Sequence, residues 1–358
     1  MDHKIFSAPQ ILDFKKAGDR RKILALRRKK TISIVDEYKE QKWELLCIKD
    51  PGVMGTAKKD SIMVSPKEGK WVYLPWKPAL VHVLDKADFE RLRTSRNQYL
   101  ILPGEHKRFM KGRIGVAGLN VGNPAAICLA LEGGGNDMKL ADFDELSVSN
   151  LNRFRAGIAE LGENKVYISA HQIYETNPYA KLTLYDRGIT RENIDEFLNK
   201  PKIDVLVEEM DALPLKILIR ERARHFRIPV VMVTGNGHDV ILDVERYDLD
   251  PKLPILNGYL KKQLIAEIAN GAAKGFPFEK KVQLARDFMG KRYLHPRLVA
   301  SFSLVGKQLA GIPQLAESSF LRGATVAYAV RQIVTGKPMK SGRHNVRLSG
   351  LGTKGNAY

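Results

Sequence analysis

The sequence predicts an α/β fold: a Rossmann-like, doubly wound and mostly parallel sheet, preceded by a smaller N-terminal α+β module. Two observations lead to this prediction. From Arg113 onward, apolar runs of strand length alternate with segments in which apolar residues recur at three- and four-residue spacing. The first run ends in a glycine turn, as in nucleotide-binding folds. A chain of 358 residues has room for one large domain and a small module.

The first 95 residues are predicted to form the small module. They contain a basic run between Arg20 and Lys30 and a helical pattern at residues 36–48. The aromatic stretch at residues 71–84 is strand-like, and its prolines, Pro75 and Pro78, favour an edge or irregular strand. The basic run suits the binding of a peptide, although an ordinary solvated helix face explains it equally well.

Residues 96–336 are predicted to form the main domain. The expected strands are residues 113–118, 139–142, 182–185, 204–208, 230–234 and 240–244. The helices expected between them are residues 124–131, 164–176, 191–198 and 213–226. These elements alternate as they do in a doubly wound sheet.

A helical segment is expected at residues 248–312, followed by a further helix and a basic tail. The predicted helices are residues 260–270, 278–288, 299–310 and 318–334, and Gly336 is a plausible cap for the last of them. The tail, residues 337–358, contains no acidic residue. We expect it to be an edge strand or a mobile segment.

Charge and cysteine content limit the possible partners and compartments. The 59 basic and 40 acidic residues give a net charge of +19, which favours an acidic peptide, a nucleotide or RNA as partner. The two cysteines, Cys47 and Cys128, are too few for a disulfide framework or a four-thiolate zinc site, so no zinc is expected. The apolar runs are far shorter than the ~20 residues of a membrane span. We expect a cytoplasmic protein that does not enter membranes.

The glycine turn is the first candidate for nucleotide binding. Gly118, Asn120 and Gly122 lie where a strand passes into a helix, whose free N–H groups suit a phosphate. The pattern is one residue shorter than the dinucleotide motif, so a simple tight turn is an alternative. Asp142 and Asp144 follow the second strand, where a carboxylate can accept hydrogen bonds from a ribose or merely cap a turn.

Three further strings give the chain a family resemblance. They are Ser-Asn-Leu-Asn-Arg at residues 149–153, Gly-Glu-Asn-Lys at residues 162–165, and Glu-Glu-Met-Asp at residues 208–211. Together with the glycine turn, they resemble the ThiF and MoeB family of adenylating enzymes, relatives of ubiquitin-activating enzymes. The resemblance covers roughly residues 96–336, and the motifs occur in the family's order.

The resemblance implies an enzyme that uses ATP and Mg²⁺ to adenylate a carboxylate. Negative charge develops on the phosphates in such a step and needs fixed cations. By the resemblance, Arg153 and Lys165 contact the phosphates, Asn150 orients them, Asp142 holds the ribose and Asp211 binds Mg²⁺. The other polar residues of these strings, Asn120, Asp144 and Asn152, are expected to line the nucleotide site.

Arg96 matches a family arginine that enters the ATP site of the neighbouring subunit, which implies a homodimer. Arg93 lies close enough in the sequence to be confused with it, and either could face solvent. Lys165 and Arg153 also have interpretations without a catalytic role. Lys165 could be a solvated lysine, and Arg153 could be a partner in a surface ion pair. The resemblance favours the catalytic interpretation of Arg96, Arg153 and Lys165.

The chain departs from the family pattern in ways that narrow its chemistry. Phe154 and Ala212 replace a usual glutamine and asparagine. No cysteine follows Val244, so the zinc-binding pairs and the acyl-accepting thiolate of many relatives are absent. Cys47 and Cys128 are expected to be packed core thiols. The activated acyl group should therefore be attacked directly by a nucleophile of the substrate.

The chain as a whole resembles a branch of the ThiF family that modifies ribosomally made peptides and is encoded in bacterial gene clusters. The resemblance includes residues 71–97 and the Ser-Gly-Arg at residues 341–343. We therefore expect adenylation and cyclisation of an acidic precursor peptide in antibiotic biosynthesis. Cyclisation of a modified base on transfer RNA is an alternative, and so is a redox or non-catalytic protein that binds NAD. His238 and His295 are weaker candidates for a general base.

Overall fold

The N-terminal part of the chain forms a small mixed sheet with three helices. The computed structural model describes residues 6–270, 276–290 and 293–351. Four strands pair in the order β1-β3-β4-β2. Their bounds are β1 Gln10–Leu12, β2 Ser33–Val35, β3 Lys70–Leu74 and β4 Ala79–Val83. The helices are α1 Ala17–Arg27, α2 Tyr38–Lys49 and α3 Lys86–Arg93.

The prediction of an edge strand at residues 71–84 is wrong. The stretch is a hairpin whose strands, β3 and β4, are the two central strands of the small sheet. Pro75 and Pro78 lie between the strands, where no ladder hydrogen bond requires an N–H group. His82 of β4 stacks between Trp71 and Tyr38, with ring centroids 4.3 and 4.1 Å away.

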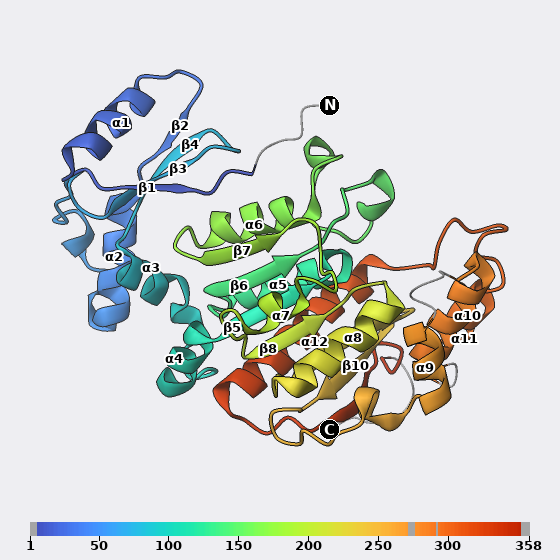
Figure 1. Ribbon diagram of the computed structural model, residues 1–358. Helices are drawn as coiled ribbons and strands as arrows, with labels where there is room; N and C mark the ends of the chain where they lie inside the picture. The colour runs from blue at the N-terminus through green and yellow to red at the C-terminus, as the bar shows by residue number, and fades with distance from the viewer. Residues whose placement is uncertain (1–5, 271–275, 291–292, 352–358) are drawn as a thin grey trace.

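A second sheet forms the centre of the molecule (Figure 1). Within the described residues its seven strands lie in the order β11-β10-β9-β8-β5-β6-β7. The five strands from β5 to β9 pair in parallel, whereas β10 and β11 are antiparallel to their neighbours. Their bounds are β5 Arg113–Ala117, β6 Asp137–Ala141, β7 Lys181–Tyr185, β8 Val205–Glu208, β9 Val230–Asn236, β10 Asp239–Glu245 and β11 Gly342–Val346. The predicted Rossmann-like, mostly parallel sheet is thus confirmed.

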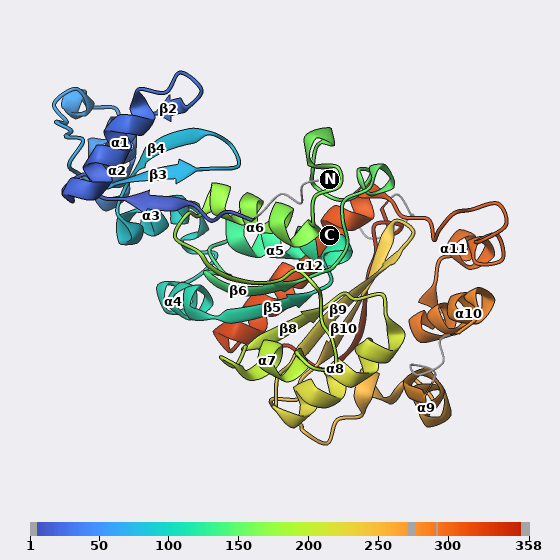
Figure 2. The same ribbon diagram turned by 45° about the horizontal axis from the view of Figure 1, so that its top comes forward.

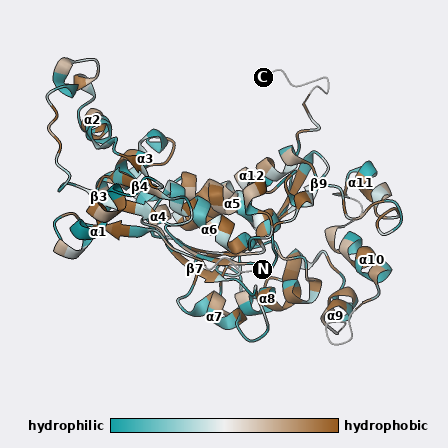
Figure 3. Cartoon of the chain, turned by 90° about the horizontal axis from the view of Figure 1, so that it is seen from above, coloured by the Kyte–Doolittle hydropathy of each residue, from teal (hydrophilic) through white to brown (hydrophobic). Residues whose placement is uncertain are grey.

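Helices cover both faces of this sheet, as Figure 3 shows from above. One face carries α5 Leu119–Leu131, α6 Lys165–Thr176 and α12 Ala316–Thr335. The opposite face carries α7 Ile194–Asn199 and α8 Leu213–His225. Apolar residues of β5, β6, β8 and β9 point alternately into the two layers, which gives one hydrophobic core on each face. The helix α4 Pro103–Lys111 precedes β5.

The segment between β10 and α12 packs beside α8 as a group of short helices (Figure 2). These are α9 Lys262–Asn270, α10 Phe278–Met289 and α11 Pro296–Ser301. The predicted helix at residues 299–310 is wrong, since α11 begins earlier and ends at Ser301. Gly306 takes a left-handed conformation (φ 81°) within the turns that follow, which a helix does not permit.

The predicted cap and part of the basic tail are found in regular structure. Gly336 has the left-handed conformation of a helix cap. Residues 342–346 form the edge strand β11 beside β10, and residues 352–358 lie outside the described residues. No helix in the described part of the chain is long and apolar enough to cross a membrane.

Candidate functional site

The carboxyl ends of β5 and β8 meet where the order of the parallel strands reverses. Ligands bind at this position in doubly wound sheets, because the flanking connections diverge there. Gly118 follows β5 with φ 89°. A Cβ at Gly118 would lie 2.5 Å from the carbonyl oxygen of Glu209, so only glycine lets the two turns pass each other.

The glycine turn is shorter than predicted. Helix α5 begins directly after Gly118, so Asn120 and Gly122 lie in its first turn and not in a loop. A Cβ at Gly122 would stand 2.7 Å from Cγ1 of Val116, and this glycine therefore permits close packing of α5 on β5. The Oδ1 atom of Asn120 is buried and has no hydrogen-bond partner among the described residues.

Asp142 lies at the amino end of α5. Its carboxylate accepts hydrogen bonds from the backbone N–H of Leu119 (2.5 Å) and of Asp144 (2.8 Å). Burial raises the pKa of Asp142, although these bonds and the charge of Lys165 oppose the shift. Asp142 therefore fixes the geometry of the turn between β5 and α5, which a phosphate or ribose would face.

The polar string at residues 149–153 lies against the start of α12. Asn150 is buried and its Oδ1 accepts a hydrogen bond from the Ser147 amide (3.2 Å). Asn152 donates through Nδ2 to the carbonyl of Gln314 (3.1 Å), while its Oδ1 accepts from Arg153 (2.8 Å). These bonds attach the string to a segment distant in the sequence and hold Arg153 in place.

Arg153 and Lys165 keep hydrogen-bonding capacity that other side chains of the described residues do not fully use. Arg153 donates through Nη1 to the Ser149 carbonyl (2.8 Å) and to Asn152, but its buried Nε has no partner within the described chain. Lys165 is only 3% exposed and donates to Asp144 at 2.9 Å. A buried lysine and a partly buried arginine with spare donors are suited to an anionic ligand.

Asp211 follows β8 and shares an electrostatic environment with these cations. Desolvation raises its pKa, Lys216 and Lys165 lower it, and Asp144 raises it. Asp211 in turn raises the pKa of Arg153, against the effect of burial. Asp144, Lys165 and Asp211 thus influence one another electrostatically, as do Asp211 and Arg153, and Lys165 bonds directly to Asp144.

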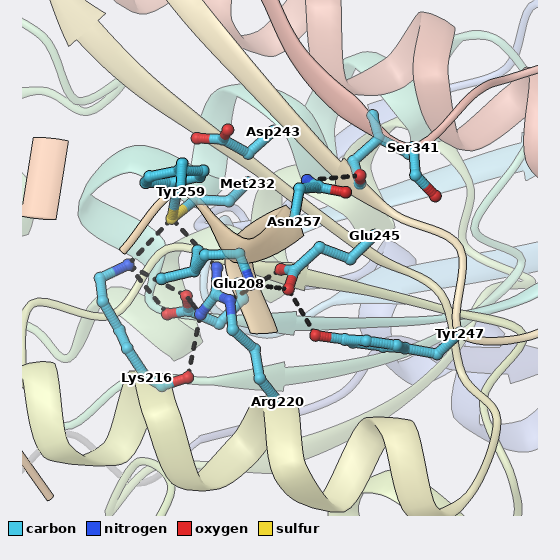
Figure 4. Close-up of polar contacts among 12 residues, drawn as sticks. Glu208, Lys216, Arg220, Met232, Asp243, Glu245, Tyr247, Asn257, Tyr259 and Ser341 are labelled. Atoms are coloured by element: carbon cyan, nitrogen blue, oxygen red, sulfur yellow. Dashed lines mark hydrogen bonds and ion pairs between the residues drawn. The ribbon is translucent and has the colours of Figure 1, made fainter. Parts of the chain in front are cut away.

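A buried network of charged side chains holds the end of β8 in place (Figure 4). Glu208 accepts hydrogen bonds from Lys216 (3.0 Å), from Arg220 and from the Met210 amide (2.9 Å). Arg220 also donates to Glu245 (2.8 Å), which accepts from the Tyr247 hydroxyl (2.5 Å). The Glu208 carboxylate is held by the Lys216 and Arg220 side chains and by the backbone amide of Met210. These bonds fix the direction that the chain takes after β8.

Arg96 is not brought to this site within its own chain. It is an exposed residue of the 3₁₀ turn Ser95–Asn97, which precedes α4 and the amino end of β5, whereas the site lies at the carboxyl end. The structure also separates it from Arg93, which pairs with Glu90 (2.7 Å) and donates to the Ala130 carbonyl (2.6 Å). Arg93 is therefore structural, and Arg96 remains the candidate for a neighbouring subunit.

A cavity of about 170 Å³ adjoins Asp211 and was not predicted. It lies between the end of β9 and α12, and its polar lining comprises Glu209, Asp211, Lys216, Thr234, Gln314, Ser318 and Arg322. Arg322 is 3% exposed. It lies in an ordinary helical pattern, so no local sequence signal distinguishes it from a surface arginine.

The cysteines and histidines take minor positions. Burial raises the pKa of the Cys128 thiol to about 11, so it is a poor nucleophile, and Cys47 is half-buried. His238 pairs with Glu317 (3.2 Å) near the surface. His295 accepts a hydrogen bond from the Arg297 amide (3.3 Å) as the cap of α11. The described residues contain no group of three or more His, Cys, Asp or Glu that could hold a metal ion.

Fold and site together define a class of protein. Residues 94–240, which span β5 to the start of β10, match the model of the ThiF family. The chain therefore contains a ThiF family domain, and the resemblance seen in the sequence is confirmed.

Individual relatives support this assignment. The chain is 36% identical over 327 residues to an uncharacterized protein of Mycobacterium tuberculosis, covering 90% of this chain and 43% of that protein. It is 26% identical over 171 residues to a tRNA threonylcarbamoyladenosine dehydratase of Haemophilus influenzae, covering 46% of this chain and 65% of that enzyme. The chain thus spans less than two thirds of the length of either relative.

The fold is shared with a solved structure. The crystal structure of selenomethionine PaaA matches with a TM-score of 0.50 and 18% identity, covering 84% of this chain and 78% of that one. The match extends beyond residues 94–240, so the similarity in fold includes elements outside the ThiF family domain.

Proposed function

We propose that the protein is an ATP-dependent adenylating enzyme that activates a carboxylate on an acidic precursor peptide. The observation that carries the proposal is the convergence of Arg153, Lys165 and Asp211 at the carboxyl ends of β5 and β8. A buried lysine, a partly buried arginine and an adjacent carboxylate suit a triphosphate better than they suit an uncharged ligand.

In this proposal, a carboxylate oxygen of the substrate attacks the α-phosphorus of ATP. A bond forms between that oxygen and phosphorus, and the bond to the departing pyrophosphate breaks. Arg153 and Lys165 hold the phosphates, Asn150 and Asn152 fix the position of Arg153, and Asp142 and Asp144 face the ribose. The amino end of α5, with Gly118, Asn120 and Gly122, supplies backbone donors.

Asp211 is the proposed ligand for Mg²⁺. This ion is commonly held by one or two carboxylates together with substrate phosphates, so a dedicated group of three protein ligands is not required. When bound, Mg²⁺ would supply positive charge next to the phosphate oxygens. We propose no zinc site.

The basic surface of α1 supports a peptide partner. Arg20, Arg21, Lys22 and Arg27 are all exposed, and the described residues contain no ion pair that neutralises them. An acidic peptide would gain from this field. Because no cysteine follows Val244, a nucleophile within the peptide would attack the adenylate directly. Cyclisation of two adjacent glutamates, as in pantocin biosynthesis, is the specific reaction that we propose in this class.

A homodimer would complete the site. Arg96 adjoins an exposed apolar segment, since Tyr99 is 92% and Leu100 81% exposed. Such a segment is typical of a protein interface. We propose that it packs against a second copy and places Arg96 beside that copy's phosphates.

Transfer RNA is a second candidate substrate. The tRNA-modifying relative of Haemophilus influenzae and the net charge of +19 favour it. Binding to transfer RNA that weakens steeply with salt would support this alternative, because each phosphate contact releases counterions. Absence of binding at low salt would remove it.

The main proposal is tested by calorimetric titration with ATP·Mg²⁺ and with NAD, followed by reaction. We expect binding of ATP, release of pyrophosphate when an acidic peptide is added, and a peptide product that has lost water by mass spectrometry. Tight binding of NAD without binding of ATP would overturn the proposal in favour of a redox or non-catalytic role.

A further inference from the structure

The cavity between β9 and α12 contains a buried arginine that forms no ion pair within the described residues. Arg322 is 3% exposed, and within the described residues its guanidinium donates hydrogen bonds to Gln314 Oε1 alone, at 3.3 Å from both Nη1 and Nη2. In the same part of the chain its Nε has no hydrogen-bond partner, and no carboxylate forms an ion pair with it. A buried cation in this state is strongly unfavourable unless an anion joins it.

Two acidic groups of the cavity, Glu209 and Asp211, act on Arg322 through space, but neither accepts one of its hydrogen bonds. Glu209 accepts a hydrogen bond from the Val233 amide at 2.7 Å. Lys216, the other cation of the cavity, is paired with Glu208 at 3.0 Å. Burial lowers the pKa of Arg322 to about 10, which leaves it charged at neutral pH. Of the two cations in the cavity lining, Lys216 is thus bonded directly to a carboxylate and Arg322 is not.

A second unpaired donor lies on the same face of α12. The Oγ of Ser318 is buried and has no hydrogen-bond partner within the described chain. Ser318 and Arg322 are four residues apart, which places them on one side of the helix. Gly235 of β9 faces both groups, since a Cβ there would be in ordinary contact with Ser318 Oγ (3.4 Å) and Arg322 Nη1 (3.5 Å). A hydroxyl and an arginine fork together match the two oxygens of a carboxylate.

The remaining lining and the volume determine the kind of ligand. Most of the remaining wall is apolar and includes Val121, Leu213, Met232, Ala285, Phe288 and Met289. The volume of about 170 Å³ is close to the ~150 Å³ that accommodates benzene, and well below the ~300 Å³ at which pockets for larger ligands begin. An aliphatic side chain that ends in a carboxylate fits these conditions, and a triphosphate does not.

We propose that this cavity binds the acidic side chain of the substrate, with Arg322 and Ser318 holding the carboxylate. The inference rests on the proposed function and assigns the position of the substrate within it. Because Asp211 lines the same cavity, the bound carboxylate lies next to the proposed Mg²⁺ and phosphate site.

Equilibrium binding without ATP tests this inference. The probes are the blocked dipeptides acetyl-Glu-Glu-amide and acetyl-Gln-Gln-amide, titrated into the full chain and into the Arg322→Met variant. We expect the wild-type chain to prefer the acidic probe and Arg322→Met to lose about 10- to 100-fold in affinity for it, as expected for one charged hydrogen-bonding partner.

The matched control is Arg331→Met, on the same helix. Arg331 pairs with Glu132 at 3.2 Å, outside the cavity lining, so this variant should bind the acidic probe like the wild type. Arg322→Met should also keep or raise the melting temperature, because it replaces an unpaired buried charge by an apolar side chain. Retained preference for the acidic probe in Arg322→Met, or no preference in the wild type, would overturn the inference.

Two further measurements separate the possible failures. Loss of ATP affinity in Arg322→Met with unchanged peptide affinity would assign Arg322 to the phosphates and overturn the carboxylate site. If the acidic probe binds through Arg322 but no peptide supports pyrophosphate release, the proposed function fails while the binding site stands.

Discussion

Gly323 of α12 lies directly against Pro124 of α5. A Cβ at Gly323 would stand 2.7 Å from the carbonyl oxygen of Pro124, so the two helices approach as closely as glycine allows. Pro124 lies within α5, and Gly323 is the neighbour of Arg322. The close approach of the helices therefore sets the depth at which Arg322 enters its cavity.

The variant Gly323→Ala should be destabilised by about 1–3 kcal/mol, because its methyl group must displace backbone and not a flexible side chain. Urea unfolding measures the change. Gly18→Ala is the control: nothing lies within 4 Å of a Cβ at Gly18 in α1, so stability should stay equal or rise slightly. Equal effects of the two substitutions would contradict the packing argument.

The variant Asp211→Asn should lose Mg²⁺-dependent pyrophosphate release by about 100-fold or more, since it removes the proposed metal ligand and its charge. The control is Asp195→Asn. It removes a carboxylate of α7 that pairs with Arg222 of α8 at 2.6 Å and has no proposed role in metal binding. Undiminished release by Asp211→Asn would refute the metal assignment.

The variant Lys165→Ala should bind ATP at least about tenfold more weakly, because a buried cation that faces the phosphates is lost. Its ion-pair partner, Asp144, has a side chain that is 45% exposed and can be hydrated, so folding should persist. Lys181→Ala removes a lysine whose side chain is 68% exposed and serves as control in the same titration. Similar ATP affinities of both variants would exclude Lys165 from the site.

If Arg96 acts on the neighbouring subunit, two inactive variants should restore activity when mixed. A heterodimer of Arg96→Ala and Asp211→Asn chains has one site with both native residues, so random exchange should return about one quarter of the wild-type rate. The measurement is pyrophosphate release after subunit exchange. Activity that stays at the level of the single variants would show that Arg96 does not act in trans.

Lys139 should make stability dependent on pH at alkaline values. It is a buried residue of β6 that donates to the carbonyls of Glu196 (3.0 Å) and Phe197 (2.7 Å), and burial lowers its pKa to about 8. Above that pH the unfolded chain retains a proton that the folded chain has released, so stability rises with pH until the ordinary lysine range.

The measurement compares wild-type and Lys139→Met chains by urea unfolding between about pH 8 and about pH 10. The wild type should gain stability relative to the variant across this interval, because only the wild type has a buried amine to deprotonate. A constant difference would show that Lys139 keeps its proton in the folded chain.

Much of the sheet was predictable because buried strands are continuous apolar runs. All four residues of β8, Val205–Glu208, are buried, and this strand was expected to within one residue. The roles of Arg153, Lys165 and Asp211 were expected from the family resemblance and stay predictions. The structure places Lys165 at the start of α6 and Asp211 shortly after β8.

The parts that sequence reasoning missed depend on contacts between distant segments. The start of α5 depends on how closely Gly122 can pack on Val116, which a glycine pattern alone does not reveal. The cavity depends on Arg322, which reaches the ends of β8 and β9 only because α12 folds back onto α5. Arg220 is fully buried between Glu208 and Glu245, and its position in a helical segment of the sequence does not indicate this burial.

The position of α12 has a consequence for synthesis on the ribosome. Val326, Val330 and Ile333 of this helix complete the core beside α5, yet they are translated after every parallel strand. A nascent chain grows from its amino end, so the apolar faces of α5 and β9 stay uncovered until α12 emerges. The hydrophobic core is then completed late in synthesis, in the same step that places Arg322 in its cavity. A chain halted before this step would expose the apolar face of the sheet to chaperones.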